Sequence, residues 1–195
     1  MIKKKEVVYR AILAAALEKK QLSFTQLELS KKFKFSLSTV NNALKPLEAI
    51  GAIEKKPRSF AVVDIRKMLS FWSSERRLQR DIIYSTRIDK PVQKIEGEMP
   101  AAVVFTAYSG YRLLFNEAPA DYGEVYVYAD AATLDELKER FPKKQGPPNL
   151  FVLEKDDYMP AAPFAPQPQI YVDLWNLKEW YARDFLDAFE RRLFI

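Results

Sequence analysis

The sequence predicts a mixed α/β protein built from two domains. Residues 1–65 show helical apolar spacing followed by two short strand patterns, whereas residues beyond 89 alternate between strand and helix patterns. Charge divides in the same way: residues 1–65 carry thirteen Lys and Arg against six Asp and Glu, and residues 66–195 carry eighteen against twenty. We therefore expect an N-terminal domain over 1–65, a connecting helix over 66–88 and a C-terminal α/β domain over 89–195.

The composition excludes several classes of function. The chain has no cysteine and no histidine, which excludes disulfides, thiol catalysis, thiolate zinc sites and Ser-His triads. No apolar run approaches the ~20 residues that cross a bilayer, and no signal-peptide hydrophobic region follows the first six residues. We expect a cytoplasmic protein that has no enzymatic activity, binds no metal or cofactor and does not associate with a membrane.

Three helices are expected in the N-terminal domain. Apolar side chains recur at helical spacing over residues 5–20 and again over 26–33. In the second of these helices, Leu27, Leu29 and Phe33 are expected to face inward.

The third helix is predicted to begin near Ser36 and to end at Gly51. Either Ser36 or Ser38 can cap its first turn, and Gly51 supplies the left-handed residue that ends a helix. Pro46 lacks the amide hydrogen for a bond within the helix, so we expect the helix to kink or restart there. Apolar side chains at spacings of four and three form one stripe: Val40, Leu44 and Leu47.

A basic hairpin is expected after this helix. Residues 52–56 and 60–63 are two short strand patterns, and Pro57-Arg58-Ser59 between them is a tight turn. Three helices followed by a β-hairpin within about 65 residues match the size of one winged helix-turn-helix domain. The N-terminal domain is therefore predicted to be a winged helix-turn-helix that binds double-stranded DNA.

The polar side chains of this domain form two groups of candidate contacts. Those on the third helix, away from its apolar stripe, are expected to contact base edges: Ser38, Thr39, Asn41 and Asn42. The basic side chains are expected to contact the DNA backbone: Lys31, Lys32, Lys34, Lys45, Lys55, Lys56 and Arg58. For any single cation, a solvated surface position is the alternative.

A resemblance supports this interpretation. The stretch LSFTQLELSKKFKFSLSTVNNALKPLEAIGAIEKK, residues 22–56, resembles the winged-helix domains of prokaryotic transcription regulators. The shared features are a helix, a turn, a serine-rich cap, the segment TVNNALKPLE, and the Gly and Ile that follow it. Because many regulator families share this pattern, the resemblance implies DNA binding without indicating a target sequence.

The remaining elements are expected as follows. Apolar residues spaced seven and four apart over 64–87 predict the connecting helix, and residues 101–114 fit either a helix or a strand. Beyond them the patterns predict strands over 124–129 and 149–154, a helix over 133–141, a strand or bend over 169–174 and a closing helix over 180–193.

The C-terminal half carries a second resemblance. The stretches PPNLFVLEKDD, PQIYVDLWNL and WYARDFLDAFERRL resemble the C-terminal domain of the AbiEi-type regulators. Those proteins are autorepressing antitoxins of type IV toxin–antitoxin (abortive-infection) systems. The resemblance implies a transcriptional regulator that represses its own operon and counters a nucleotidyltransferase-type toxin. The sequence fixes no oligomeric state.

Two other hypotheses remain open at this point. The first is a ligand-responsive repressor, in which the C-terminal domain binds a small molecule beneath the proline-rich segment 158–168. The second is a degenerate nucleotidyltransferase built on Asp121, Glu124 and Asp130, although the paired carboxylates that would hold Mg2+ are missing from the strand. A set of side chains that follows the proline-rich segment could form either a functional surface or part of the core: Gln169, Tyr171, Asp173, Trp175 and Asn176.

Overall fold

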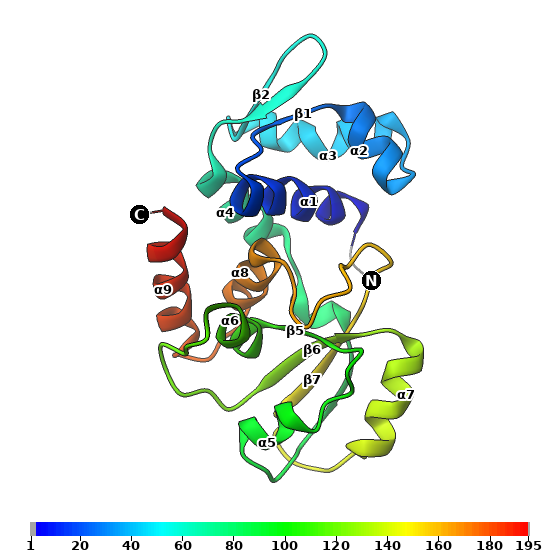
Figure 1. Cartoon of the computed structure of the whole chain (residues 1–195), viewed down its shortest axis with the longest axis vertical. Coiled ribbons are helices and arrows are strands. Elements are labelled where there is room, and N and C mark those ends of the chain that lie inside the picture. Colours follow the sequence, from blue (N-terminus) through cyan, green and yellow to red (C-terminus); the bar gives the residue numbers. More distant parts are fainter. Residues whose placement is uncertain (1–2, 195) are drawn as a thin grey trace. The chain divides into compact units, whose positions relative to one another are not determined.

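The computed structural model describes residues 3–194 and is a mixed α/β structure with two sheets (Figure 1). These residues divide into two compact units: one comprises residues 3–76 together with 166–168, and the other comprises residues 77–165 and 169–194. No helix in the described part of the chain is long and apolar enough to cross a membrane.

The N-terminal unit consists of helices packed beside a small sheet. Its elements are α1 (Lys4–Lys19), β1 (Ser23–Phe24), α2 (Gln26–Phe33), α3 (Leu37–Ala49), β2 (Ile53–Lys55), β3 (Phe60–Val62) and α4 (Ile65–Glu75). The sheet order is β1-β3-β2 with antiparallel pairing throughout. The turn between β2 and β3 extends away from helices α1 to α3 (Figure 1).

Helix α3 has the caps that its sequence predicts. The Ser36 hydroxyl accepts a hydrogen bond from the Thr39 amide at 3.0 Å, so Ser36 is the N-cap. Gly51 adopts φ +68°, and the Ala52 amide donates to the Leu47 carbonyl at 2.8 Å, which closes the C-terminus. The helix passes through Pro46 without the expected restart.

The apolar stripe of α3 is buried completely, which explains why one missing hydrogen bond at Pro46 does not end the helix. Val40, Leu44 and Leu47 are each 0% exposed. The Tyr9 hydroxyl of α1 donates to the Ala43 carbonyl of α3 at 2.9 Å. Burial of this stripe supplies far more stabilisation than one backbone hydrogen bond.

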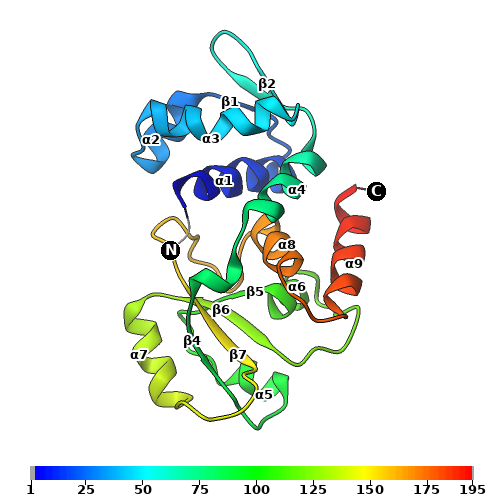
Figure 2. The same ribbon diagram turned by 180° about the vertical axis from the view of Figure 1, so that it is seen from behind.

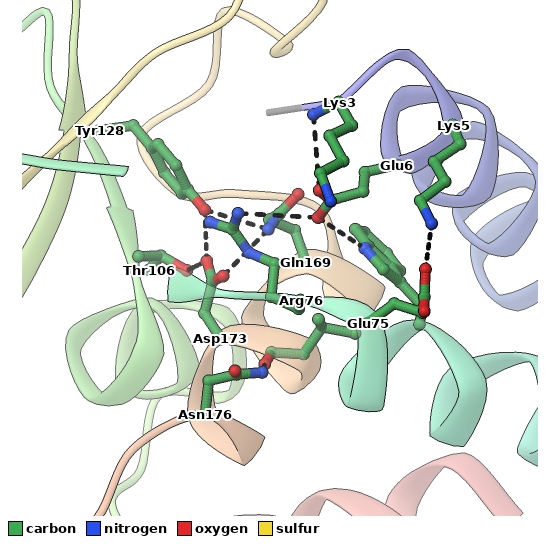
Figure 3. Close-up of polar contacts among 12 residues, drawn as sticks. Lys3, Lys5, Glu6, Glu75, Arg76, Thr106, Tyr128, Gln169, Asp173 and Asn176 are labelled. Atoms are coloured by element: carbon green, nitrogen blue, oxygen red, sulfur yellow. Dashed lines mark hydrogen bonds and ion pairs between the residues drawn. The ribbon is translucent and has the colours of Figure 1, made fainter. Parts of the chain in front are cut away.

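A buried polar group joins the two ends of the N-terminal unit. The Trp72 indole of α4 donates to Glu6 Oε2 at 3.1 Å. Arg76 Nη1 lies 3.6 Å from the same oxygen (Figure 3). Glu6 and Arg76 are both almost fully buried. Because an unpaired buried charge is costly, this group holds α4 against α1 in one arrangement.

The C-terminal unit is built on a four-stranded mixed sheet covered by helices (Figure 2). The strands are β4 (Ile82–Thr86), β5 (Val104–Thr106), β6 (Val125–Ala129) and β7 (Leu150–Glu154), in the order β4-β7-β6-β5. The helices are the 3-10 helix η1 (Leu78–Asp81), α5 (Val92–Gly97), α6 (Ala107–Phe115), α7 (Ala131–Arg140), α8 (Gln167–Trp175) and α9 (Ala182–Phe194). Strands β6 and β7 are parallel and α7 connects them.

Strand β6 is buried on both of its faces. Val125 and Val127 pack in one apolar cluster with Leu137 of α7. Tyr126 lies on the opposite face, where the centre of its ring is 6.3 Å from the centre of the Tyr108 ring of α6. The sheet therefore has helices on both faces, as a sheet with parallel central strands requires.

Two expected elements differ from the structure, and one segment that fitted either a helix or a strand is now assigned. The prediction of one connecting helix over 66–88 is wrong. Helix α4 ends at Glu75, and Arg76 is extended with ψ 139°. Residues 82–86 form β4, which pairs with β7. Residues 169–174 form part of helix α8 and are not a strand. Residues 101–114 contain both alternatives, because β5 leads directly into α6 through Ala107 at φ +51°.

Candidate nucleic-acid interface

One face of α3 carries the polar side chains that the sequence singled out. Ser38, Asn42 and Lys45 are exposed and Asn41 is half-buried. The spacing of these residues along the chain places them on a single face of the helix, opposite the apolar stripe. Leu37, four residues before Asn41, lies at the border between this face and the apolar stripe and is 50% exposed.

Thr39 differs from the other candidates on this helix. Its hydroxyl lies 2.8 Å from the Ser36 hydroxyl, and its amide donates to the same oxygen. The side chain is half-buried. The Thr39 hydroxyl is therefore engaged in the cap, which leaves Ser38, Asn41 and Asn42 as the stronger candidates for base contact.

The hairpin supplies three of the predicted cations. Lys56 and Arg58 are exposed, and the Lys56 amide donates to the Ser59 carbonyl at 2.8 Å, which closes the turn. Lys55 is half-buried, and its ammonium lies 2.5 Å from Glu48 Oε2. One of the three cations is therefore already paired within the protein.

Three further predicted cations lie at the end of α2. Lys31, Lys32 and Lys34 are all exposed. Lys34 adopts φ +54° as the C-cap of the helix, and its amide donates to the Ser30 carbonyl. Lys32 Nζ lies 5.3 Å from the centre of the Phe33 ring, within range of a cation–π contact.

A groove of about 260 Å³ lies between the hairpin and the starts of α2 and α3. It brings together Lys55, Lys56 and Arg58 with residues that the sequence analysis did not select. The further lining residues are Thr25, Gln26, Leu27, Leu37, Pro57 and Ser59. Within this unit, cations and exposed apolar side chains therefore share one recess.

Leu27 corrects a sequence expectation. It was expected to face inward with Leu29 and Phe33, yet it is 51% exposed, whereas each of the other two is 5% exposed. Residues two apart on a helix lie about 200° apart around its axis, so Leu27 and Leu29 cannot both face the core. That angle was the available signal for Leu27, whereas Leu37 is seven residues before Leu44 and in register with the buried stripe, so local spacing gave no signal for its exposure.

In the C-terminal unit, Asp173 belongs to a buried polar network and not to a surface. Thr106 Oγ1 donates to Asp173 Oδ2 at 2.7 Å, and the Tyr128 hydroxyl donates to the same oxygen at 2.6 Å (Figure 3). Gln169 Nε2 donates to Asp173 Oδ1 at 3.0 Å. All four side chains are almost fully inaccessible to solvent.

The other side chains that follow the proline-rich segment divide between core and surface. Tyr171 is buried and Trp175 is 46% exposed. Asn176 lies in the turn after α8 and donates from its side chain to the Val172 carbonyl. No functional surface is assembled from this set.

Two of the three acidic residues considered for a nucleotidyltransferase site have structural partners, and the third, Asp121, is exposed. Asp130 is the N-cap of α7, and hydrogen bonds from the Thr133 amide and hydroxyl lower the pKa of its carboxyl below the usual range. Glu124 accepts a hydrogen bond from the Tyr181 hydroxyl. Within residues 3–194, no three carboxylates are grouped so that they could hold a metal ion.

The resemblance to the AbiEi-type regulators rests on short stretches of sequence and stays a prediction. The function of the α3 face and the groove is therefore argued from their own residues. A scan against models of protein families, a search of curated proteins and a search of solved structures returned no match to this chain.

Proposed function

We propose that the N-terminal unit is a winged helix-turn-helix domain that binds duplex DNA, and that the protein is a transcriptional regulator with no enzymatic activity. One observation carries this proposal: a helix buried on its apolar face presents the polar side chains of Ser38, Asn41, Asn42 and Lys45 on its opposite face, next to a hairpin that bears Lys55, Lys56 and Arg58. This pairing is what a winged helix uses to bind DNA, with a helix in the major groove and cations on the backbone.

In this proposal α3 is the recognition helix. An α-helix with side chains is about 10–12 Å across, and the major groove of B-DNA is about 12 Å wide, so α3 fits the groove lengthwise. Asn41 and Asn42 suit bidentate hydrogen bonds with adenine. Ser38, near the N-terminus of the helix, suits either a base edge or a phosphate oxygen.

The cations set affinity more than sequence choice. Lys31, Lys34, Lys45, Lys56 and Arg58 are exposed and available to neutralise phosphates. Each phosphate contact contributes about −0.9 to the slope of log K against log salt concentration. Five contacts give a slope of about −4.5. Lys55 should contribute less to this slope than an unpaired lysine, because it forms an ion pair with Glu48.

The cellular role within this proposal is that of a cytoplasmic, autorepressing antitoxin. This part rests on the AbiEi-type resemblance of the C-terminal half, which implies a nucleotidyltransferase-type toxin as the protein partner. A reporter gene placed behind the DNA upstream of this gene should be repressed by the wild-type protein and not by Asn41→Ala/Asn42→Ala.

The direct test is fluorescence anisotropy of the whole protein on that upstream DNA and on a shuffled duplex, across a salt series. Wild-type binding should favour the upstream duplex and weaken with salt. Asn41→Ala/Asn42→Ala should lose the preference between duplexes, since each bidentate base contact contributes about 1–3 kcal/mol of discrimination. Lys55→Gln/Lys56→Gln should bind both duplexes more weakly by a similar factor.

A matched control separates this interface from general charge effects. Lys19→Gln/Lys20→Gln removes the same charge from two exposed lysines at the end of α1, outside the α3 face and the groove. It should bind nearly as the wild type does. If the wild-type protein binds neither duplex at low salt, the N-terminal unit is not a DNA-binding domain.

A further inference from the structure

One exposed apolar side chain, that of Leu37, borders the polar face of α3. Leu37, Asn41 and Lys45 follow one another at intervals of four residues, so they lie along one line of the helix surface. Leu37 is 50% exposed, although its neighbours on this face are polar or charged. As the first residue of α3, it is at the end of the helix whose residues contact base edges in helix-turn-helix proteins.

The groove places a second leucine beside the first. Leu27, at the start of α2, is 51% exposed and lines the same recess as Leu37. Lys55, Lys56 and Arg58 of the hairpin line it too. The recess therefore offers apolar contact and positive charge to a single ligand, and a nucleotide that carries an apolar substituent on its base combines the two.

Only one base edge in the major groove carries an apolar group. That group is the C5-methyl of thymine, and adenine, guanine and cytosine present only hydrogen-bonding groups there. We propose that the groove takes a thymidine nucleotide of the bound DNA, with the C5-methyl packed against Leu37 and Leu27 and the adjacent phosphate held by the hairpin cations. This inference rests on the DNA-binding function proposed above and adds thymine recognition to it.

The size of the expected effect follows from the apolar contact. Burial of one methyl-sized group contributes about 0.8 kcal/mol, which corresponds to roughly a fourfold change in the dissociation constant. Replacement of thymine by uracil removes only this methyl and keeps every Watson–Crick hydrogen bond. The uracil-substituted duplex therefore isolates the proposed contact.

The experiment measures binding of the whole protein to its upstream duplex, synthesised once with thymine and once with deoxyuridine at every thymine position. Wild-type protein should bind the uracil duplex roughly fourfold more weakly for each methyl contacted. Leu37→Ala should reduce the difference between the two duplexes, and Leu27→Ala/Leu37→Ala should bind them nearly equally, because it lacks both side chains that contact the methyl. The control is Leu22→Ala, a leucine that is 46% exposed outside the groove, and it should keep the wild-type difference.

The outcomes separate this inference from the function on which it rests. If the wild-type protein prefers the upstream duplex over a shuffled one but binds thymine and uracil forms equally, thymine recognition is overturned and DNA binding stands. If Leu37→Ala keeps the full thymine preference, the methyl contact does not involve Leu37 and the inference is again overturned. If no duplex is bound, both the inference and the DNA-binding function fail.

Discussion

Lys55 Nζ lies 2.5 Å from Glu48 Oε2, so a cation of the hairpin is bound to a carboxylate on the last turn of α3. Glu48 is exposed and Lys55 half-buried, which makes this an ion pair accessible to solvent and exchangeable for a phosphate. A protein that uses Lys55 on DNA must first break the pair. In the proposed DNA complex, the pair is therefore expected to oppose the contribution of Lys55.

The first prediction concerns this pair. Glu48→Gln should tighten binding to specific and shuffled duplexes alike, because it releases Lys55 and removes a negative charge near the backbone. The slope of log K against log salt should become steeper by about 0.9, the contribution of one additional phosphate contact. Glu54→Gln removes the same charge from β2 and should leave the slope closer to that of the wild type. Identical slopes for both variants would contradict the prediction.

The second prediction concerns the start of α3. Ser36→Ala should lower the free energy of unfolding by about 1 kcal/mol, because the Thr39 amide loses its acceptor. Ser38 lies two residues later and is exposed, so Ser38→Ala should change the free energy of unfolding by less than about 0.5 kcal/mol. Urea unfolding of both variants measures the difference, and equal losses would show that Ser36 is not the effective cap.

The third prediction concerns the buried network of the C-terminal unit. Thr106→Val keeps the shape of the side chain but removes the donor to Asp173, so it should cost about 1 kcal/mol, the typical net contribution of one hydrogen bond. Ser109→Ala is the control, because the Ser109 hydroxyl of α6 is buried without a hydrogen-bond partner in the described part of the chain, so its removal breaks no hydrogen bond there. Thermal unfolding should rank Thr106→Val as the less stable variant. The reverse order would show that the hydrogen bond between Thr106 and Asp173 does not stabilise the fold.

The fourth prediction concerns pH. The pKa of the Asp130 carboxyl is lowered in the folded state by the two hydrogen bonds from Thr133. A group with a lowered folded-state pKa stabilises the fold above its unfolded pKa, about 3.9, and loses that contribution as pH falls through the folded value.

Asp130→Asn keeps a capping side chain without a charge, so it should match the wild type at pH 7 within about 0.5 kcal/mol. As pH falls from about 5 to about 2, the wild type should lose stability that Asp130→Asn does not lose. Asp130→Ala should already cost about 1 kcal/mol at pH 7. Parallel pH curves for the wild type and Asp130→Asn would rule out a contribution from the carboxylate charge.

Two errors in the C-terminal half show where local patterns fail. Phe71, Leu78 and Ile82 fit helical spacing, but Ile82 lies in β4 because its strand pairs with β7, about seventy residues later. The stretch QIYVDL has strand-forming residues, but it forms α8, whose Gln169 and Asp173 meet one turn apart in the buried network. Distant partners determined both elements, and propensity is a weak guide when such partners compete with it.

The sequence by itself determined helix α3 with its caps, its buried stripe and its polar face. Caps and helical spacing are interactions among residues at most five apart, so they can be recognised without knowledge of the rest of the fold. Only the tertiary structure decided the pairing of Lys55 with Glu48 and the exposure of Leu27 and Leu37 beside the hairpin. These features depend on where the β2–β3 turn comes to lie against α2 and α3, and long-range packing fixes that position.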